Sequence, residues 1–72
     1  MLEDGTYEAL VFDADDHPDG GIAVELTILA GEHKGAVVSV VSHSWTGDAL
    51  DLLGIPATIT VAGGHPRVTF EP

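Results

Sequence analysis

A strict two-residue alternation from Ile22 to Leu29 limits the possible folds of this chain more than any other feature. Every second residue of the segment is a large aliphatic one, and successive side chains of an extended strand point to opposite faces. The aliphatic face consists of Ile22, Val24, Leu26 and Ile28. Because the period is two and not 3.6, we predict a half-buried β-strand here.

Four further segments have the composition of strands. The alternation recurs at 57–61 and again at 68–70. Residues 6–12 are apolar on both sides, which is typical of a long strand that bends and serves two sheets. Residues 36–42 form a β-branched run in which either face can be the buried one, so the register of this strand stays open. Turn-forming residues separate the strands, and Gly63-Gly64 predicts a tight hairpin.

Between residues 44 and 54 the alternation stops, and we predict one short helix near residues 47–53. Thr46 or Asp48 can cap its start, and Gly54 ends it. A helix of about two turns is not stable alone, so it must pack against the sheet. The side chains expected to face the core are Leu50 and Leu53, together with Leu52 or Ile55.

The length and composition describe one small, self-supporting domain spanning residues 1–72. The chain has no cysteine, so neither a disulfide framework nor a thiolate metal site can hold it together. Its start lacks the features of a secretory signal, and no apolar run approaches the roughly 20 residues of a transmembrane helix. We expect a soluble, cytoplasmic protein with no membrane partner.

The charge balance is strongly acidic. Twelve Asp and Glu residues oppose only two cations, Lys34 and Arg67, which gives a net charge of −10. A protein whose main task is to neutralise phosphate groups needs the opposite balance, so this composition argues against nucleic acid as the main partner. Three explanations stay open: an ordinary acidic protein, adaptation to high salt, and an acidic surface that docks a basic partner.

The expected order of elements, β-β-β-α-β-β, resembles the oligonucleotide/oligosaccharide-binding (OB) fold, a small five-stranded, partly open Greek-key barrel. An SH3-like barrel and an open five-stranded sheet with one helix are the alternatives. Residues 24–38 are also similar to a strand–Gly-x-x-x-Gly–strand hairpin of small phage-type single-strand-binding proteins, and to short uncharacterised bacterial proteins. The predicted fold class is therefore mostly β, as an OB-like barrel.

The OB resemblance implies a ligand face on the second and third strands. The candidate interaction face comprises Glu25, Thr27, Leu29, Val37, Ser39 and Val41. None of these residues is aromatic or basic, whereas binders of single-stranded nucleic acid use both types. If Leu29, Val37 and Val41 are exposed, they form an apolar strip suited to a protein partner or a homodimer. If the register is the other one, they belong to the core.

Two smaller groups of residues are candidate sites. His43, Trp45 and His65 are candidates for the edge of a binding cleft, although Trp45 can equally close one end of the barrel with its indole N–H bonded to a loop carbonyl. Asp15, His17 and Asp19 are weak metal candidates. They fit the first positions of a calcium loop, but Leu26 stands where a bidentate Glu belongs. His17 and His65 would meet if their loops are neighbours.

No arrangement in the sequence predicts catalysis. The chain lacks a cysteine nucleophile, a serine-centred elbow and a glycine-rich phosphate loop of known spacing. We therefore expect a protein that is not an enzyme and has no cofactor and no metal. The favoured function is an interaction module for another protein or a second copy of itself. The alternatives are a single-stranded nucleic-acid-binding OB protein and an acidic nucleic-acid mimic.

Overall fold

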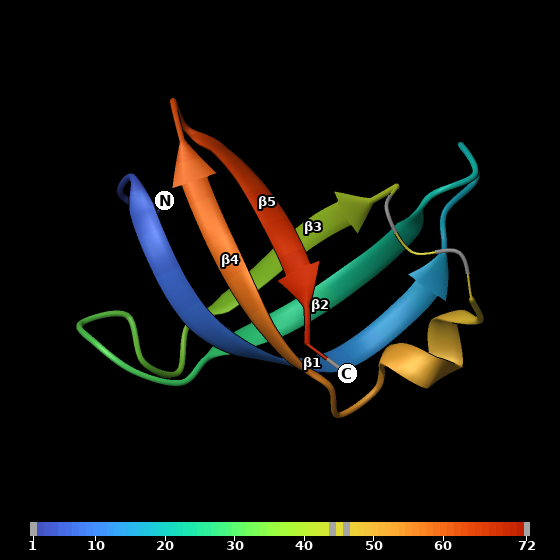
Figure 1. The fold of residues 1–72 in the computed structure, drawn as a ribbon, viewed down its shortest axis with the longest axis horizontal. Helices are drawn as coiled ribbons and strands as arrows, with labels where there is room; N and C mark the ends of the chain where they lie inside the picture. Colours follow the sequence, from blue (N-terminus) through green and yellow to red (C-terminus); the bar gives the residue numbers. More distant parts are fainter. Residues whose placement is uncertain (1, 44, 46, 72) are drawn as a thin grey trace.

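The computed structural model of the protein describes residues 2–43, 45 and 47–71, which form a strongly curled five-stranded sheet (Figure 1). Its elements follow the predicted order, with a helical turn between the third and fourth strands. The strands are β1 (Gly5–Asp16), β2 (Ile22–Ile28), β3 (Val37–Ser42), β4 (Pro56–Ala62) and β5 (His65–Phe70). In the sheet they lie in the order β3-β2-β1-β4-β5, and all neighbours are antiparallel.

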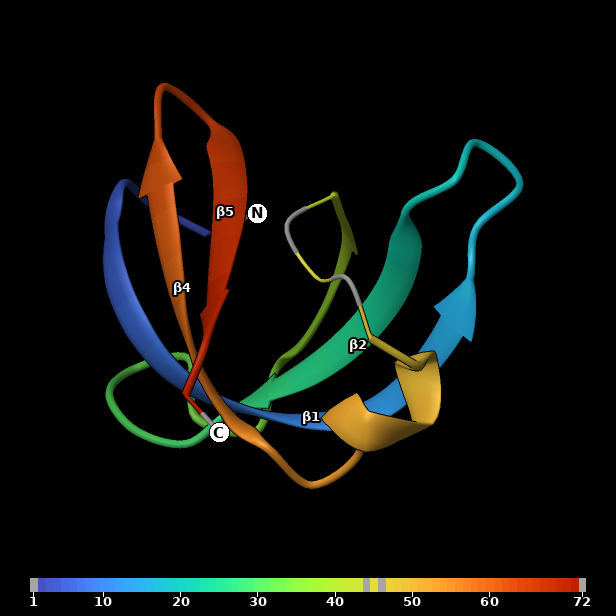
Figure 2. The same ribbon diagram turned by 45° about the vertical axis from the view of Figure 1, so that its right-hand side comes forward.

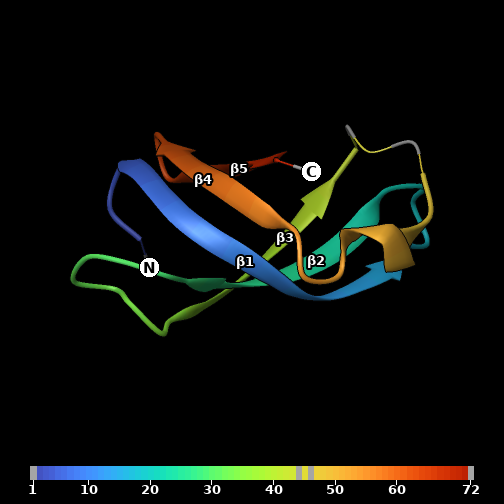
Figure 3. The same ribbon diagram turned by 60° about the horizontal axis from the view of Figure 1, so that its bottom comes forward.

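Strand β1 belongs to both halves of the molecule, as its two-sided apolar pattern predicted. Residues 5–10 pair with β4, whereas residues 9–11 and 13–16 pair with β2, with a shift of register between Val11 and Asp13. Such an irregularity bends a strand and increases its twist. Figure 2 shows the result as two arms, the β4–β5 hairpin and the β2–β3 hairpin, which rise from a shared β1. Figure 3 shows β1 crossing between them.

The core lies on the concave side of the curled sheet and is one continuous apolar cluster. The aliphatic face predicted for β2 is buried, and Leu26 is fully inaccessible. Ile59 of β4 and Leu52 of the helical turn are also completely buried. The structure resolves the register of β3: Val40 and Ser42 point inward. β3, whose register the sequence left open, therefore turns the side chains of its odd-numbered residues outward.

The predicted helix is a single 3-10 turn, η1 (Ala49–Leu52), and not a two-turn α-helix. Asp48 takes the cap position without a side-chain hydrogen bond, and Leu53 has already returned to extended backbone, so only one turn fits before Gly54. Thr46, the other predicted cap, lies outside the described residues. The prediction that Leu50 and Leu53 face the core was wrong, because they are 73% and 45% exposed. Leu52 alone of the three leucines is buried.

The curled sheet does not close into a barrel. Within the described ranges, neither β3 nor β5 has a paired strand on its outer edge. β3 and β5 approach each other between the two arms (Figure 2), and we call the region where these two edges face each other the seam. At one end of the seam, the ring of Trp45 contacts that of Phe70 edge-to-face at a centroid distance of 5.8 Å. No helix of the described residues has the length and apolarity needed to cross a membrane.

Candidate functional site

The candidate interaction face lies on the convex side of β2 and β3. Antiparallel pairing places Thr27 opposite Val37, and Glu25 opposite Ser39. Val37 is 57% exposed, Leu29 43% and Val41 40%. The three aliphatic side chains therefore lie outside the core. Glu25 and Thr27 are half-buried on the same face, and Ser39 is exposed.

Acidic residues border this face on the side of β1. Asp13 pairs with Glu25 and Asp15 pairs with Ala23, so both aspartates continue the convex rows of β2. These residues line a shallow depression of about 210 Å³ together with Val41. The result is an aliphatic strip along β3 with carboxylates one and two strands away.

The free edge of β3 presents unpaired backbone groups at alternate residues. The Ile28 N–H donates to the Ala36 carbonyl at 3.0 Å, and the Gly35 N–H donates to the Ile28 carbonyl at 2.8 Å. Hydrogen-bonded pairs recur at every second residue of an antiparallel ladder, so the even-numbered residues of β3 bond to β2. The odd-numbered residues direct their N–H and C=O groups away from β2, toward the seam between β3 and β5. These residues are Val37, Ser39 and Val41.

A groove of about 760 Å³ occupies one end of the seam. Its walls are the last residues of β3 on one side and β5 on the other, and the described residues that line it include no carboxylate. The aromatic and basic members of the lining are His43, Trp45, Arg67 and Phe70. This groove gathers one of the two cations of the chain and two of its four aromatic rings.

Trp45 covers this end of the half-barrel beside η1, in agreement with one of its two predicted interpretations. Its indole N–H donates to the Asp48 carbonyl at 3.0 Å, and the ring packs against Phe70. His43 lines the same groove. His65, the third predicted cleft residue, is exposed at the start of β5 and does not line this groove.

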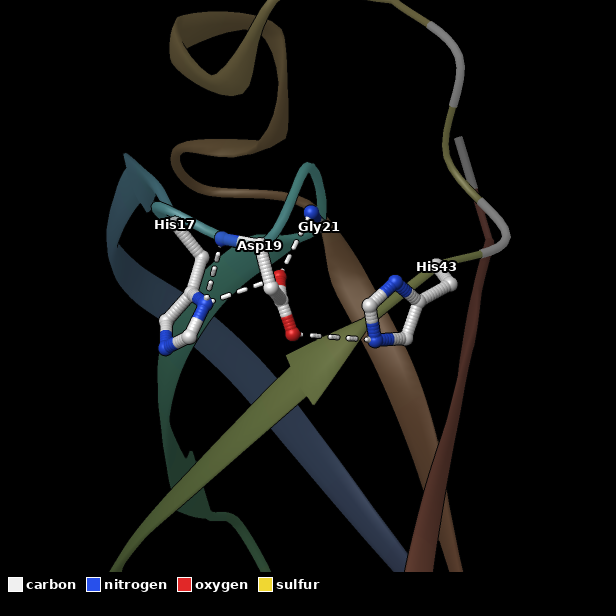
Figure 4. A network of polar contacts seen from close by, with 4 residues as sticks. All are labelled: His17, Asp19, Gly21 and His43. Carbon is white, nitrogen blue, oxygen red and sulfur yellow. Dashed lines mark hydrogen bonds and ion pairs between the residues drawn. The ribbon is translucent and has the colours of Figure 1, made fainter.

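Asp19 joins two histidines from different elements (Figure 4). Its Oδ1 lies 2.8 Å from Nδ1 of His17 and its Oδ2 lies 3.7 Å from Nε2 of His43. The Gly21 N–H donates to Oδ1 at 2.9 Å. The backbone hydrogen bond from Gly21, followed by the side-chain hydrogen bond with His17, holds the pKa of the Asp19 carboxyl below its ordinary value of 3.8.

This network corrects two sequence-based ideas. The histidine that approaches the β1–β2 loop is His43, which follows β3, and not His65. The suggested metal group also divides, because Asp15 lies on the convex face while His17 and Asp19 contact each other in the loop. Throughout 2–43, 45 and 47–71, no three His, Asp or Glu side chains are grouped in a way that could hold a metal ion.

Several surface residues were not singled out from sequence. Arg67, Val68 and Phe70 line the seam groove, which no local pattern indicates because it exists only when β5 faces β3. Phe12 is 48% exposed on the convex side, next to the irregularity in β1. Comparisons with known proteins add no relative, since no family model, curated protein or solved structure matches the chain.

Proposed function

We propose that this protein is a non-catalytic interaction module that docks another polypeptide on the candidate interaction face. The observation that carries the proposal is the exposure of Val37 and Val41 on the convex side of β3. Exposed aliphatic residues that lie together mark protein interaction sites.

The resemblance to the OB fold is part of this proposal. A partly open five-stranded antiparallel barrel with a helical element between strands three and four is what the resemblance implies. The element order and the curled sheet support it. An OB-like scaffold places its binding surface on strands β2 and β3, where the aliphatic strip lies.

Single-stranded nucleic acid is the second candidate ligand, and the seam groove is the observation that favours it. Arg67 and His43 accompany two aromatic rings there, and such rings can stack with bases. However, Trp45 and Phe70 pack edge-to-face on each other, which leaves less of either ring available for stacking. The net charge of −10 further opposes a phosphate backbone. The acidic-mimic alternative rests on Asp13, Asp15 and Glu25, which border the aliphatic strip on the side of β1.

An amide-resolved NMR titration with a short oligothymidine at low salt separates the first two candidates. We expect no shifts, because the face lacks cations. Low salt is the most permissive condition for nucleic-acid binding, so the absence of shifts there would exclude this ligand. Shifts confined to residues 13–29, 37–43 and 62–66 would make nucleic-acid binding the leading function.

The protein-docking proposal has its own test in the concentration dependence of the same spectrum. Self-association through this face would broaden or shift amides of β2 and β3 as the concentration rises. Leu29→Asp and Val41→Asp should each abolish that dependence while leaving the rest of the spectrum in place. If the parent protein self-associates and both variants still do so, the aliphatic strip is not the docking surface.

A further inference from the structure

We propose that the partner on the candidate interaction face is a polypeptide segment that carries lysine or arginine beside aliphatic side chains. The segment would lie flat across the convex side of β1, β2 and β3. The inference rests on the proposed docking function and names the chemistry of its partner. It requires contacts with side chains of the convex side only, so β3 and β5 stay together at the seam.

Aliphatic and acidic side chains lie in register on the convex side, because strand pairing fixes their positions. Val41 of β3 lies opposite Ala23 of β2, which in turn lies opposite Asp15 of β1. Neighbouring strands are about 4.8 Å apart, so acidic positions follow about 5 to 10 Å from the aliphatic strip on β3. The next row on the same face consists of Ser39, Glu25 and Asp13.

The three carboxylates of this face, those of Asp13, Asp15 and Glu25, have no cationic partner among the described residues. The ion pairs found in that part of the chain join Asp19 to two histidines, and neither lysine nor arginine takes part in one. Asp13 and Glu25 lie directly opposite each other, and like charges in that position destabilise a sheet. A cation supplied by a partner would relieve this repulsion.

These carboxylates and the aliphatic strip line the same shallow depression of about 210 Å³. Asp13, Asp15 and Glu25 lie on one side of it, and Val41 lies on the other. A lysine side chain fits such a boundary, because its methylene stem covers apolar surface while its ammonium group reaches the carboxylates. An anionic ligand would instead meet three like charges there. The depression therefore suits a cation that arrives on an apolar stem.

The dimensions of the face suit one segment of polypeptide. Val37 and Val41 are four residues apart on β3, which corresponds to about 13 Å, and the distance from β3 to β1 is about 10 Å. A helix with its side chains is about 10–12 Å wide, and about 13 Å of its length corresponds to two to three turns. An extended strand of a few residues fits as well. Because the contact is small, we expect reversible binding.

The charge of the whole molecule favours the same partner. A net charge of −10 attracts a cationic segment over a long distance and speeds its encounter with the face. A second copy of this chain carries the same charge and has only Lys34 and Arg67 to offer. The observations therefore favour a different, basic polypeptide over self-association.

An amide-resolved NMR titration with three short capped peptides tests this chemistry. One peptide alternates leucine with lysine, the second leucine with glutamate, and the third serine with lysine. We expect the leucine–lysine peptide to shift amides within residues 13–15, 23–29 and 37–41, and to bind on the order of tenfold more tightly than either control. Equal binding of the leucine–glutamate peptide would overturn the cationic partner. Equal binding of the serine–lysine peptide would reduce the attraction to charge alone and overturn the inference.

Two variants with the same loss of charge test whether the attraction belongs to this face. The face variant should weaken binding of the leucine–lysine peptide on the order of tenfold, and the control variant by less than about twofold. Without peptide, the face variant should melt about 2–4 °C higher than the parent, because the repulsion between β1 and β2 is relieved. Equal weakening by both variants would overturn the inference. The face variant combines Asp13→Asn, Asp15→Asn and Glu25→Gln, and the control combines Glu3→Gln, Asp16→Asn and Asp51→Asn, which are exposed elsewhere.

Val37→Thr and Val41→Thr separate this inference from the proposed function. Threonine keeps the β-branched shape at these exposed positions, so the fold should persist while the aliphatic contact is lost. If these variants weaken peptide binding and the face variant weakens it no more than its control, the docking face stands and the cationic partner is wrong. Shifts confined to another surface would overturn both proposals. If no peptide binds, the inference is overturned, whereas the docking function keeps its separate test in self-association.

Discussion

The two edge strands of the sheet, β3 and β5, differ in the features that discourage pairing with a further strand. β5 carries Pro66 and Arg67. The Glu71 N–H bonds to the Pro56 carbonyl, so the odd-numbered residues of β5 bond to β4 and the backbone groups of the even-numbered residues point to the seam. Pro66 thus removes a donor at the free edge without costing a bond to β4, and the neighbouring Arg67 adds a charge. Both are devices that discourage further strand pairing. β3 has neither device, and it differs from β5 in this respect.

The two strands are also held differently. β3 anchors itself through buried Val40 and Ser42, whereas none of the six residues of β5 is fully buried. β5 depends instead on its pairing with β4 and on contacts at its ends. Asp4 accepts hydrogen bonds from the N–H groups of Gly63 and Gly64, at 3.1 and 3.3 Å, and Phe70 packs on Trp45. β3 is therefore the more firmly anchored edge.

The largest expected effect tests whether the two arms are one cooperative unit. Leu26→Ala in β2 and Ile59→Ala in β4 each remove a fully buried side chain, and each should lower the free energy of unfolding by about 2–5 kcal/mol. Because the core is continuous, each variant should weaken hydrogen-exchange protection in both arms. If the alanine variants unfold, Ile59→Val can be used in their place, because it should lower the free energy of unfolding by only about 0.5–1.5 kcal/mol. Loss of protection in one arm alone would show that the edges belong to independent units.

A smaller effect is expected at the end of β3. A Cβ at Gly21 would lie 2.8 Å from Cε1 of His43 and 3.0 Å from the Ser42 carbonyl oxygen. Gly21→Ala should therefore displace the His43 ring and cost about 1–3 kcal/mol, measured by urea unfolding. The same substitution in a His43→Ala background should cost less, because the ring is gone. An identical cost in both backgrounds would mean that the clash with Ser42 dominates.

A still smaller effect on stability is expected for Asp4, which holds the turn between β4 and β5. Asp4→Ala removes both carboxylate hydrogen bonds to the Gly63-Gly64 turn, and because they are exposed we expect a loss of about 1 kcal/mol. Amide exchange at Gly63 and Gly64 should accelerate, with β3 unaffected. Glu3→Ala is the control, since Glu3 accepts from the Tyr7 hydroxyl through its backbone carbonyl and not through its carboxylate. Equal effects of the two variants would assign the change to net charge.

The smallest effect is a pH dependence at the β1–β2 loop. Folding lowers the pKa of Asp19, so its charged form is the one the fold stabilises. That contribution is complete above a pH of about 3.8, the ordinary value, and disappears as the pH falls through the lower folded value. The Gly21 amide shift should report this transition, and Asp19→Asn should remove it. A Gly21 titration that persists in the variant would point to another group.

The sequence predicted the features of the fold that depend on residues close together in the chain, and it left open those that depend on distant residues. The alternation in β2 and the two-sided pattern of β1 are local, and they predicted the buried face and the shared strand. For residues 36–42 the pattern allowed two registers, and the bonds of Ile28 and Gly35 at the β2–β3 turn decide between them. A single turn of 3-10 helix reversed the expected orientation of Leu50 and Leu53, because a helical period requires more than one turn to hold.

The candidate site was predictable only in part for the same reason. Exposure of Val37 and Val41 was one of two stated possibilities, and it depends on the register. The contact between Asp19 and His43 joins residues that are distant in sequence, so no spacing pattern could indicate it. The seam groove likewise requires β5 to face β3 across the open sheet.

The division of β1 between two partners also sets an order of events as the chain is synthesised. The half of β1 that pairs with β2 can find its partner once residue 28 has emerged, but Gly5 must wait for Val61. Until β4 is present, the first half of β1 has no partner strand. Closure of the curled sheet therefore depends on the last two strands of the sequence, and a chain that stops before β4 would expose the apolar half of β1 and be prone to aggregate.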